Sequence, residues 1–191
     1  MFMKKTTVYF SKPGPDNTTE CLEIVKNAIK DFNYRHVVVA STTGNTGKIF
    51  AEALKDEKVN LVILTHSHGY KEPNTSELPS EIKEKILASG AKIFTGTMIT
   101  HSLETALAKK FSGVYPTLLV AQSLRRFGEG AKVCCEIVMM AADAGLIPEG
   151  EEVISVAGTA SGSDTVMIIR AAVSKRFLDL KVLEILAKPR L

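Results

Sequence analysis

The segment His36-Val37-Val38-Val39-Ala40-Ser41-Thr42-Thr43-Gly44-Asn45-Thr46-Gly47 decides the fold of this chain. Its first five residues form a short apolar run, typical of a strand that is covered on both faces. The hydroxyl-rich and glycine-rich residues that follow lead directly into a helical pattern over Thr46–Lys55. A buried strand that turns sharply into a helix is the repeating unit of parallel α/β sheets.

The same alternation of short β-branched runs and longer helical patterns continues on both sides of this segment. The predicted strands are Thr6–Phe10, His36–Ala40, Val59–Leu64, Ala91–Thr95 and Glu152–Ala157. The predicted helices are one capped by Asn17 with Glu20 as capping-box partner, then Thr46–Lys55, Glu81–Ser89 after Pro79, His101–Phe111, Leu118–Phe127 and Val133–Ala144. Strands that alternate with helices imply right-handed crossovers and helices on both faces of the sheet.

The pattern changes from Thr165 onward. Val166–Val173 reads as a strand, and Val182–Ala187 reads as a second strand or a short helix. We therefore predict an α/β fold, a three-layer α/β/α domain with a mostly parallel five-stranded sheet plus C-terminal strands. Residues 1–191 form this single domain, and residues 165–191 are its C-terminal strand or hairpin extension.

Composition excludes several classes of protein. The chain has 191 residues, of which 45% are hydrophobic and 24% charged, as in an ordinary globular domain. Its net charge of +3 is spread among acids, so we expect no nucleic-acid partner. Its longest uncharged apolar stretch, Ile137–Ala142, is far shorter than the roughly 20 residues of a membrane span, so we expect no membrane partner. Three cysteines, Cys21, Cys134 and Cys135, cannot all pair, which favours a reducing, cytoplasmic location.

Ligands of open α/β sheets bind beyond the carboxyl ends of the strands. The segment Ser41–Gly47 lies at such an end and precedes a helix, whose free N–H groups and positive dipole end favour a phosphate. The alternative is an ordinary strand-to-helix turn with a hydroxyl cap. No Gly-Lys-Ser/Thr closes the segment, so it is not a Walker A motif.

Three further strand ends carry hydroxyls, glycines or histidines. Together with the first segment they predict a cradle for a phosphorylated small molecule. The candidate binding residues are Ser41, Thr42, Thr43, Gly44, Asn45, Thr46, His66, Ser67, His68, Gly96, Thr97, Met98, Gly158, Thr159, Ser161, Gly162, Ser163 and Asp164. Tyr70 is a further candidate wall of the pocket.

Several of these residues also have other interpretations. His66 and His68 could bind a metal, but no third ligand lies near them in the sequence, and His101 is the only distant candidate. We therefore expect no metal. Asp164 is a general base, a ribose acceptor or a turn residue. Thr100 or His101 is a helix cap or a ligand contact.

Outside the strand ends, structural roles prevail in our interpretation. Cys134 and Cys135 lie in an apolar helix and read as buried thiols. Arg125 and Arg126 complement the dipole at a helix end, or contact a phosphate.

From about Thr19 to Arg170 the chain resembles the C-terminal α/β domain of pyruvate kinase, above all the stand-alone archaeal and bacterial proteins made of that domain. Two blocks carry the resemblance. The first runs from the helix Glu20–Ile29 through His36–Ala40 to Ser41–Thr46, and the second from Ala144-Gly145-Leu146 through Pro148–Glu151 and Val153–Ala157 to Arg170.

In pyruvate kinases the loop equivalent to the first block grips the phosphate of a sugar-phosphate activator. Ser41, Thr43, Gly44 and Thr46 match its pattern, whereas Asn45 stands where a basic residue is common. The family places a glycine-rich loop, here Gly158–Thr165, over the same phosphate. The resemblance implies the fold without the catalytic barrel, so it does not imply pyruvate kinase activity.

Three functions follow as hypotheses. The first is a binding protein for a phosphorylated small molecule, with the mononucleotide FMN as the named candidate by analogy with flavodoxin-like sheets. The second is an enzyme on a phosphorylated metabolite, with His66, His68, His101 or Asp164 as acid–base groups. The third is a regulatory module that senses a sugar phosphate and forms a homo-oligomer. Pairing of the C-terminal strands of two chains is one way to form it.

Overall fold

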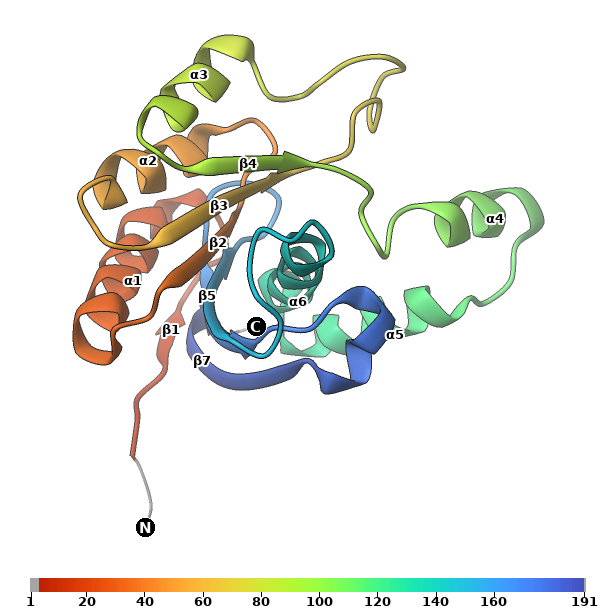
Figure 1. Cartoon of the computed structure of the whole chain (residues 1–191). Coiled ribbons are helices and arrows are strands. Elements are labelled where there is room, and N and C mark those ends of the chain that lie inside the picture. Colours follow the sequence, from red (N-terminus) through yellow and green to blue (C-terminus); the bar gives the residue numbers. More distant parts are fainter. Residues whose placement is uncertain (1–3, 191) are drawn as a thin grey trace.

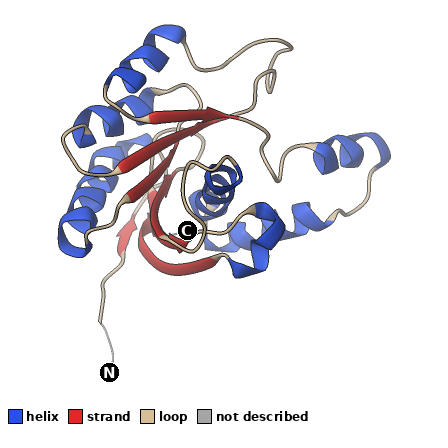
Figure 2. Ribbon diagram, in the orientation of Figure 1, coloured by secondary structure: helices blue, strands red, loops and turns tan. Residues whose placement is uncertain are grey.

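A computed structural model describes residues 4–190 of the chain; residues 1–3 and 191, at the two ends of the predicted domain, lie outside the described part. Strands and helices alternate as expected (Figures 1 and 2). The strands are β1 Val8–Phe10, β2 His36–Ala40, β3 Asn60–Thr65, β4 Lys92–Thr95, β5 Glu152–Ala157, β6 Thr165–Arg170 and β7 Lys181–Pro189. The α-helices are α1 Thr18–Phe32, α2 Asn45–Leu54, α3 Ser80–Ala88, α4 Leu103–Phe111, α5 Pro116–Leu124 and α6 Glu129–Asp143. Short 3₁₀ turns are η1 Pro15–Asn17, η2 Arg125–Phe127 and η3 Ser174–Asp179.

All seven strands form one sheet in the order β1-β7-β6-β5-β2-β3-β4. The pairs β2–β3, β2–β5, β3–β4 and β1–β7 are parallel, and only β6 runs against its two neighbours. The carboxyl ends of β2, β3, β4 and β5 therefore meet at one edge of the sheet. The prediction of a mostly parallel α/β sheet is confirmed.

Helices cover both faces of the sheet, with α1, α2 and α3 on one side and α6 on the other (Figure 1). The central strand β2 shows why its sequence is apolar throughout. Val37 and Val39 pack into the core under α1, α2 and α3, whereas Val38 packs into the core under α6. All three valines are completely buried, as the continuous apolar run predicts.

The C-terminal segment is part of the sheet rather than an appendage. The ambiguous run Val182–Ala187 is a strand, and β7 pairs with β6 on one side and with β1 on the other. The edge of the sheet on this side is therefore the short N-terminal strand β1. However, β1 pairs only with residues 187–189 of β7, so residues 181–186 have one edge without a strand partner among the described residues. The pairing of chains through the C-terminal strand stays a prediction.

Two local predictions at helix starts are wrong. Asn17 precedes α1, but its amide donates to the carbonyls of Lys12 and Gly14 instead of capping the helix, because η1 tightens the chain just before α1. Helix α6 begins at Glu129, four residues before the predicted start, since charged side chains in its first turn interrupt the apolar pattern. Within residues 4–190, no helix is both long enough and apolar enough to cross a membrane.

Candidate functional site

A cavity of about 710 Å³ opens where β2 and β5 lie side by side. From β2 the chain continues outward to β3 and β4, whereas β5 leads to β6 on the opposite side. Such a reversal of strand order leaves a crevice at the carboxyl ends, which is where α/β sheets bind ligands. The volume lies within the range of roughly 300–1,000 Å³ typical of small-molecule pockets.

The segment that follows β2 forms one wall of this cavity. Thr42, Thr43, Asn45 and Thr46 line it at the start of α2. The first N–H groups of a helix have no partner within the helix, so they and the hydroxyls are available to an anion.

Ser41 holds this segment in shape. Its backbone N–H donates to the carbonyl of Leu64 on β3 at 2.8 Å, and its Oγ accepts the N–H of Gly47 at 2.8 Å. Ser41 therefore also satisfies one donor of the first turn of α2. The alternative interpretation, a hydroxyl cap, applies to this residue, which nevertheless lines the cavity as well.

Gly44 is required at its position for two reasons. Its φ of +85° lies in the left-handed region, which disfavours residues with a side chain. A Cβ there would also lie 2.4 Å from Leu78 Cδ1 and 2.5 Å from Ile82 Cγ2. The glycine thus allows the loop to approach the α3 side of the fold while its neighbours face the cavity.

The loop between β5 and β6 forms the opposite wall, and Asp164 organises it. Asp164 is fully buried, and its Oδ2 accepts the N–H groups of Gly14 and Thr159 at 2.9 and 3.1 Å. Its Oδ1 accepts the hydroxyl of Thr165 at 2.8 Å. Because its oxygens bind within the protein and do not line the cavity, Asp164 acts as the turn residue among its three predicted roles.

The N-terminal segment closes this loop from outside. The Ser163 N–H donates to Thr18 Oγ1 at 3.0 Å, and a Cβ on Gly162 would lie 2.3 Å from Pro15 Cα. Pro15, Thr18 and Thr19 consequently line the cavity. The sequence alone gave no indication of this contact, because it joins residues about 145 positions apart.

The structure thus brings together ten of the eighteen predicted binding residues. Those that line the cavity are Ser41, Thr42, Thr43, Asn45, Thr46, His66, Met98, Gly158, Ser161 and Gly162. Those that do not line it are Gly44, Ser67, His68, Gly96, Thr97, Thr159, Ser163 and Asp164. Several of the latter shape the loops instead, as Gly44 and Asp164 do.

The loop after β3 contributes His66 and Tyr70 to the cavity. The two rings lie against each other with their centroids 4.3 Å apart. His66 Nδ1 lies 2.8 Å from Glu77 Oε2, and Lys71 Nζ lies 2.9 Å from the other carboxylate oxygen of Glu77. These contacts fix the ring of His66, whereas His68 is exposed and points elsewhere.

Helix α6 supplies a polar face that the sequence analysis missed. Glu129, Lys132, Val133, Glu136, Ile137 and Met140 all line the cavity. Their spacing of three and four residues places them on one side of a helix. The missed signal was a lysine and a glutamate four positions apart inside an otherwise apolar pattern.

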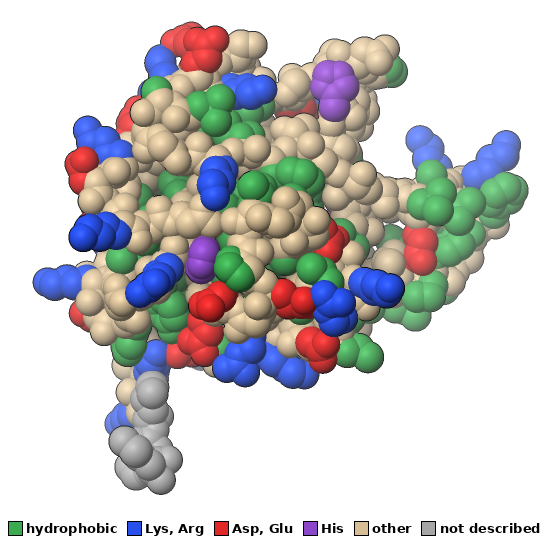
Figure 3. All heavy atoms as spheres, in the orientation of Figure 1, with side chains coloured by type: hydrophobic (Ala, Val, Ile, Leu, Met, Phe, Trp, Pro, Cys, Tyr) green, Lys and Arg blue, Asp and Glu red, His purple; other side chains and the backbone are tan. Residues whose placement is uncertain are grey.

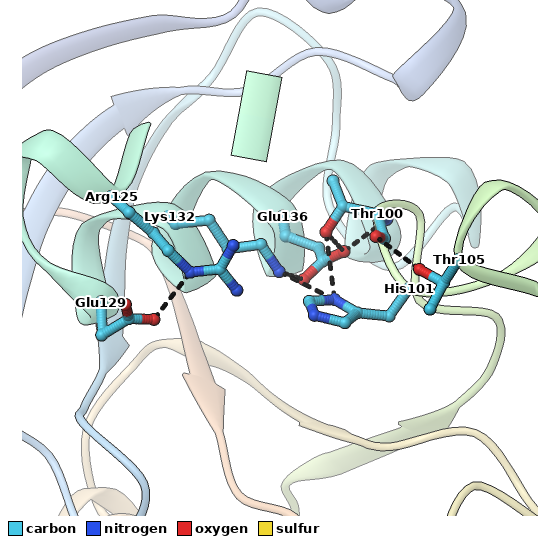
Figure 4. A network of polar contacts seen from close by, with 7 residues as sticks. All are labelled: Thr100, His101, Thr105, Arg125, Glu129, Lys132 and Glu136. Carbon is cyan, nitrogen blue, oxygen red and sulfur yellow. Dashed lines mark hydrogen bonds and ion pairs between the residues drawn. The ribbon is translucent and has the colours of Figure 1, made fainter. Parts of the chain in front are cut away.

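Lys132 and Glu136 form a buried ion pair (Figure 4). Their side chains are only 1% and 4% exposed. Glu136 Oε1 also accepts the N–H and the hydroxyl of Thr100, each at 2.7 Å. Of the two roles considered for Thr100, a helix cap or a ligand contact, the structure shows neither, because its hydroxyl donates to a buried carboxylate and it does not line the cavity.

His101 completes this network. Its Nδ1 lies 3.2 Å from Lys132 Nζ and 3.2 Å from Thr100 Oγ1, and it lines the cavity (Figure 4). Burial, reinforced by the adjacent Lys132, lowers the pKa of His101, so the neutral ring accepts from the ammonium and carries its proton on Nε2. His101 does not cap α4, whose first residue is Leu103.

Burial also governs the two charged partners. It lowers the pKa of Lys132, an effect that Glu136 partly offsets. Burial alone would raise the pKa of Glu136, but Lys132 and the two bonds from Thr100 together hold it below its ordinary value. The cavity floor therefore carries the ion pair of Lys132 and Glu136 beside the ring of His101.

The structure also shows the positions of Arg125 and of the two neighbouring cysteines of α6. Arg125 lines the cavity and its Nε donates to Glu129 Oε2 at 2.8 Å, so it does more than end a helix. Cys134 and Cys135 are buried, as predicted. Across residues 4–190, no group of three or more His, Cys, Asp or Glu side chains is placed to hold a metal ion.

Fold and site together define an α/β domain with a cavity at the carboxyl ends of its parallel strands. Residues 19–169 match the family model "Pyruvate kinase, alpha/beta domain". The chain belongs to this family, as its two sequence blocks indicated. The described residues form this domain alone and contain no barrel.

Several solved structures are similar to parts of this chain. Two crystal structures of pyruvate kinase from Cryptosporidium parvum are 18% and 17% identical, with TM-scores of 0.45 and 0.43, over 84% of this chain. O-ureido-L-serine synthase is 17% identical over 71% of this chain and 42% of its own, with a TM-score of 0.32. This chain spans 24% and 23% of the length of the two pyruvate kinases.

Proposed function

We propose that this protein binds a phosphorylated small molecule in the cavity between β2 and β5. The observation that carries the proposal is the convergence of two hydroxyl-rich and glycine-rich loops on one crevice at the start of α2. The phosphate would contact the free N–H groups of α2 and the hydroxyls of Thr43 and Thr46. Gly158–Gly162 would close over it from the β5 side.

FMN is the named candidate for the whole ligand. An isoalloxazine ring needs a flat space with a mainly apolar wall and a few polar groups. Met98, Val133, Ile137 and Met140 supply apolar wall, and His66 and Tyr70 supply rings beside it. These features support a flavin, by analogy with other sheets that bind FMN at this edge.

A flavin titration tests both parts of the proposal. FMN fluorescence should be quenched on binding, and riboflavin, which lacks the phosphate, should bind at least tenfold more weakly. Excess inorganic phosphate should compete with FMN. Phosphate binding without FMN binding would remove the flavin and keep the phosphate site, whereas binding of neither would overturn the proposal.

A matched pair of variants locates the phosphate. Asn45→Asp places a negative charge in the first turn of α2 and should weaken FMN binding at least tenfold. Asn27→Asp makes the same change on an exposed position of α1 outside the cavity and should leave binding unchanged. Equal affinities for the two variants would place the phosphate elsewhere.

An enzymatic role is the second candidate, and the network at Lys132 favours it. Lys132 and His101 both line the cavity with pKa values below their ordinary range, as acid–base groups require. His66 also lines the cavity, whereas His68 and Asp164 do not. Of the four residues in the acid–base hypothesis, His66 and His101 therefore remain, and the structure adds Lys132 as a further candidate.

Phosphorus NMR of the protein with its co-purified ligand distinguishes the two candidates. A bound phosphate signal that stays constant indicates a binding protein. A signal that converts with time, and no longer converts in His101→Ala while binding persists, indicates an enzyme. The buried free thiols of all three cysteines support a reducing, cytoplasmic setting for either function.

A regulatory oligomer is the third hypothesis, and it needs a contact between chains. Within residues 4–190, residues 181–186 of β7 pair with β6 on one side and have no strand partner on the other, because β1 reaches only residues 187–189. This part of the strand and the exposed helix α4 are the two surfaces proposed for that contact.

A further inference from the structure

Helices α4 and α5 form an arm, residues 103–124, that projects from the body of the domain (Figure 1). It leaves the body after β4 and returns at α6. None of the nine residues of α4 is buried. Since α4 buries none of its residues, it receives little stabilisation by packing against its own chain. A helix of this length is only marginally stable in water without such packing.

The arm and its base carry large apolar side chains in water. Leu103 is 71% exposed, Phe111 69%, Val114 75%, Leu119 57% and Phe127 55%. Hydrophobic atoms gather over the arm in the space-filling view, with lysines beside them (Figure 3). Single exposed apolar residues are normal, but a cluster of this size marks an interaction surface.

The sequence of α4 is suited to pairing with itself. Leu103, Leu107 and Phe111 recur every four residues and so lie along one face of the helix. If two α4 helices pair antiparallel about an axis at Leu107, Leu103 lies level with the partner's Phe111. Glu104, whose Oε2 also accepts the N–H and the hydroxyl of Thr117 on α5, then lies level with the partner's Lys110, which places opposite charges near each other at both ends.

The exposed area suits a dimer. Leu103 and Phe111 of α4, together with Val114, Leu119 and Phe127 beside it, expose on the order of 600 Å². This area is close to the roughly 800 Å² that each partner contributes to a standard interface. A two-fold dimer uses one patch twice, so an apolar patch with complementary charges at its ends is sufficient.

We propose that two copies of this chain form a two-fold dimer through the α4–α5 arms, with antiparallel α4 helices packed along Leu103, Leu107 and Phe111. This inference goes beyond the proposed ligand and does not depend on it. Both stems of the arm reach the cavity, through His101 before α4 and Arg125 after α5. The dimer thus holds the two sides of each cavity in place.

Light scattering on the full chain tests the assembly. The mass should be twice that of the chain or an even multiple of it. Leu103→Asp with Phe111→Asp should give a folded monomer, because both side chains are exposed within the chain. The control Leu178→Asp, at an 82% exposed position on η3, should leave the mass unchanged.

Cysteine cross-linking tests the pairing itself. Leu107→Cys lies at the proposed two-fold axis and should form a disulfide between chains under mild oxidation. Leu103→Cys should not, because it lies about 12 Å along the helix axis from its counterpart in the partner. The native cysteines are buried and do not interfere.

The outcomes are decisive in both directions. An even multiple that becomes a monomer in the double variant, with cross-linking at position 107 only, supports the proposal. A wild-type monomer, an odd multiple, or an assembly that survives the double variant overturns it. Circular dichroism of each variant shows that its fold is retained.

Discussion

Lys132 and Glu136 lie one turn apart on α6 and form an ion pair that is almost completely buried at the wall of the cavity. Neither charge is available to solvent, and Glu136 is held further by Thr100. Breaking a buried pair by removing one partner is costly because it leaves the other charge without compensation. The same two residues therefore stabilise the domain and form part of the cavity wall.

Lys132→Met should lower the free energy of unfolding by about 3 kcal/mol, because it leaves the Glu136 carboxylate buried and unpaired. The matched control is Lys85→Met, which breaks a pair of the same spacing with Glu81 on the exposed face of α3. The control should leave the urea midpoint nearly unchanged, since exposed pairs contribute little. Equal effects of the two variants would contradict a structural role for the buried pair.

The stability contributed by Glu136 should depend on pH. Its pKa in the folded state lies below that of the unfolded chain, which is about 4.3. A depressed pKa stabilises the fold above the unfolded value, and this contribution is lost as pH falls through the folded value. The difference in unfolding free energy between wild type and Glu136→Gln should therefore shrink below about pH 4. A difference that stays constant or grows with acid would show that the carboxylate is not held ionised.

Alanine substitutions at Gly44 and Gly90 separate the cost of backbone strain from the cost of a steric clash in the free energy of unfolding. Both have a φ of +85°, but a Cβ on Gly90 would meet no atom within 4 Å. Gly90→Ala should cost about 1 kcal/mol through backbone strain alone. Gly44→Ala should cost a further 1–3 kcal/mol or so from the clash with Leu78 and Ile82, and should also weaken phosphate binding. Urea unfolding and a phosphate titration measure the two effects, and equal costs would mean that the loop can relax.

The three thiols should be unreactive in the native protein. Burial raises the pKa of Cys21 and of Cys135 to about 12, and it raises that of Cys134 as well. Since the thiolate is the reactive form, a disulfide reagent at pH 8 should modify none of them within minutes. All three should react in denaturant. Rapid modification of the folded protein would show that α1, which carries Cys21, or α6, which carries Cys134 and Cys135, opens locally.

The sequence by itself determined the layers of the sheet and half of the site. The valines of β2 and the glycines and hydroxyls after it carry that information locally, because a strand buried on both faces must be apolar and a tight turn into a helix needs glycine. The position of α2 and its free N–H groups followed from this segment alone. The loop after β5 was recognised for the same reason.

Only the tertiary structure decided which of these residues line the cavity and which residues from other segments lie beside them. Asp164 and Gly44 are residue types that often contact ligands, but here they do not line the cavity. Asp164 accepts hydrogen bonds from the protein itself, and Gly44 allows the loop its conformation. Pro15, Thr18, Lys132 and Glu136 reach the cavity from segments far apart in the sequence, and no local pattern reports such meetings. Burial and pairing then set the charges of Lys132, Glu136 and His101, because electrostatic free energies depend on what surrounds a group in space rather than on its neighbours along the chain.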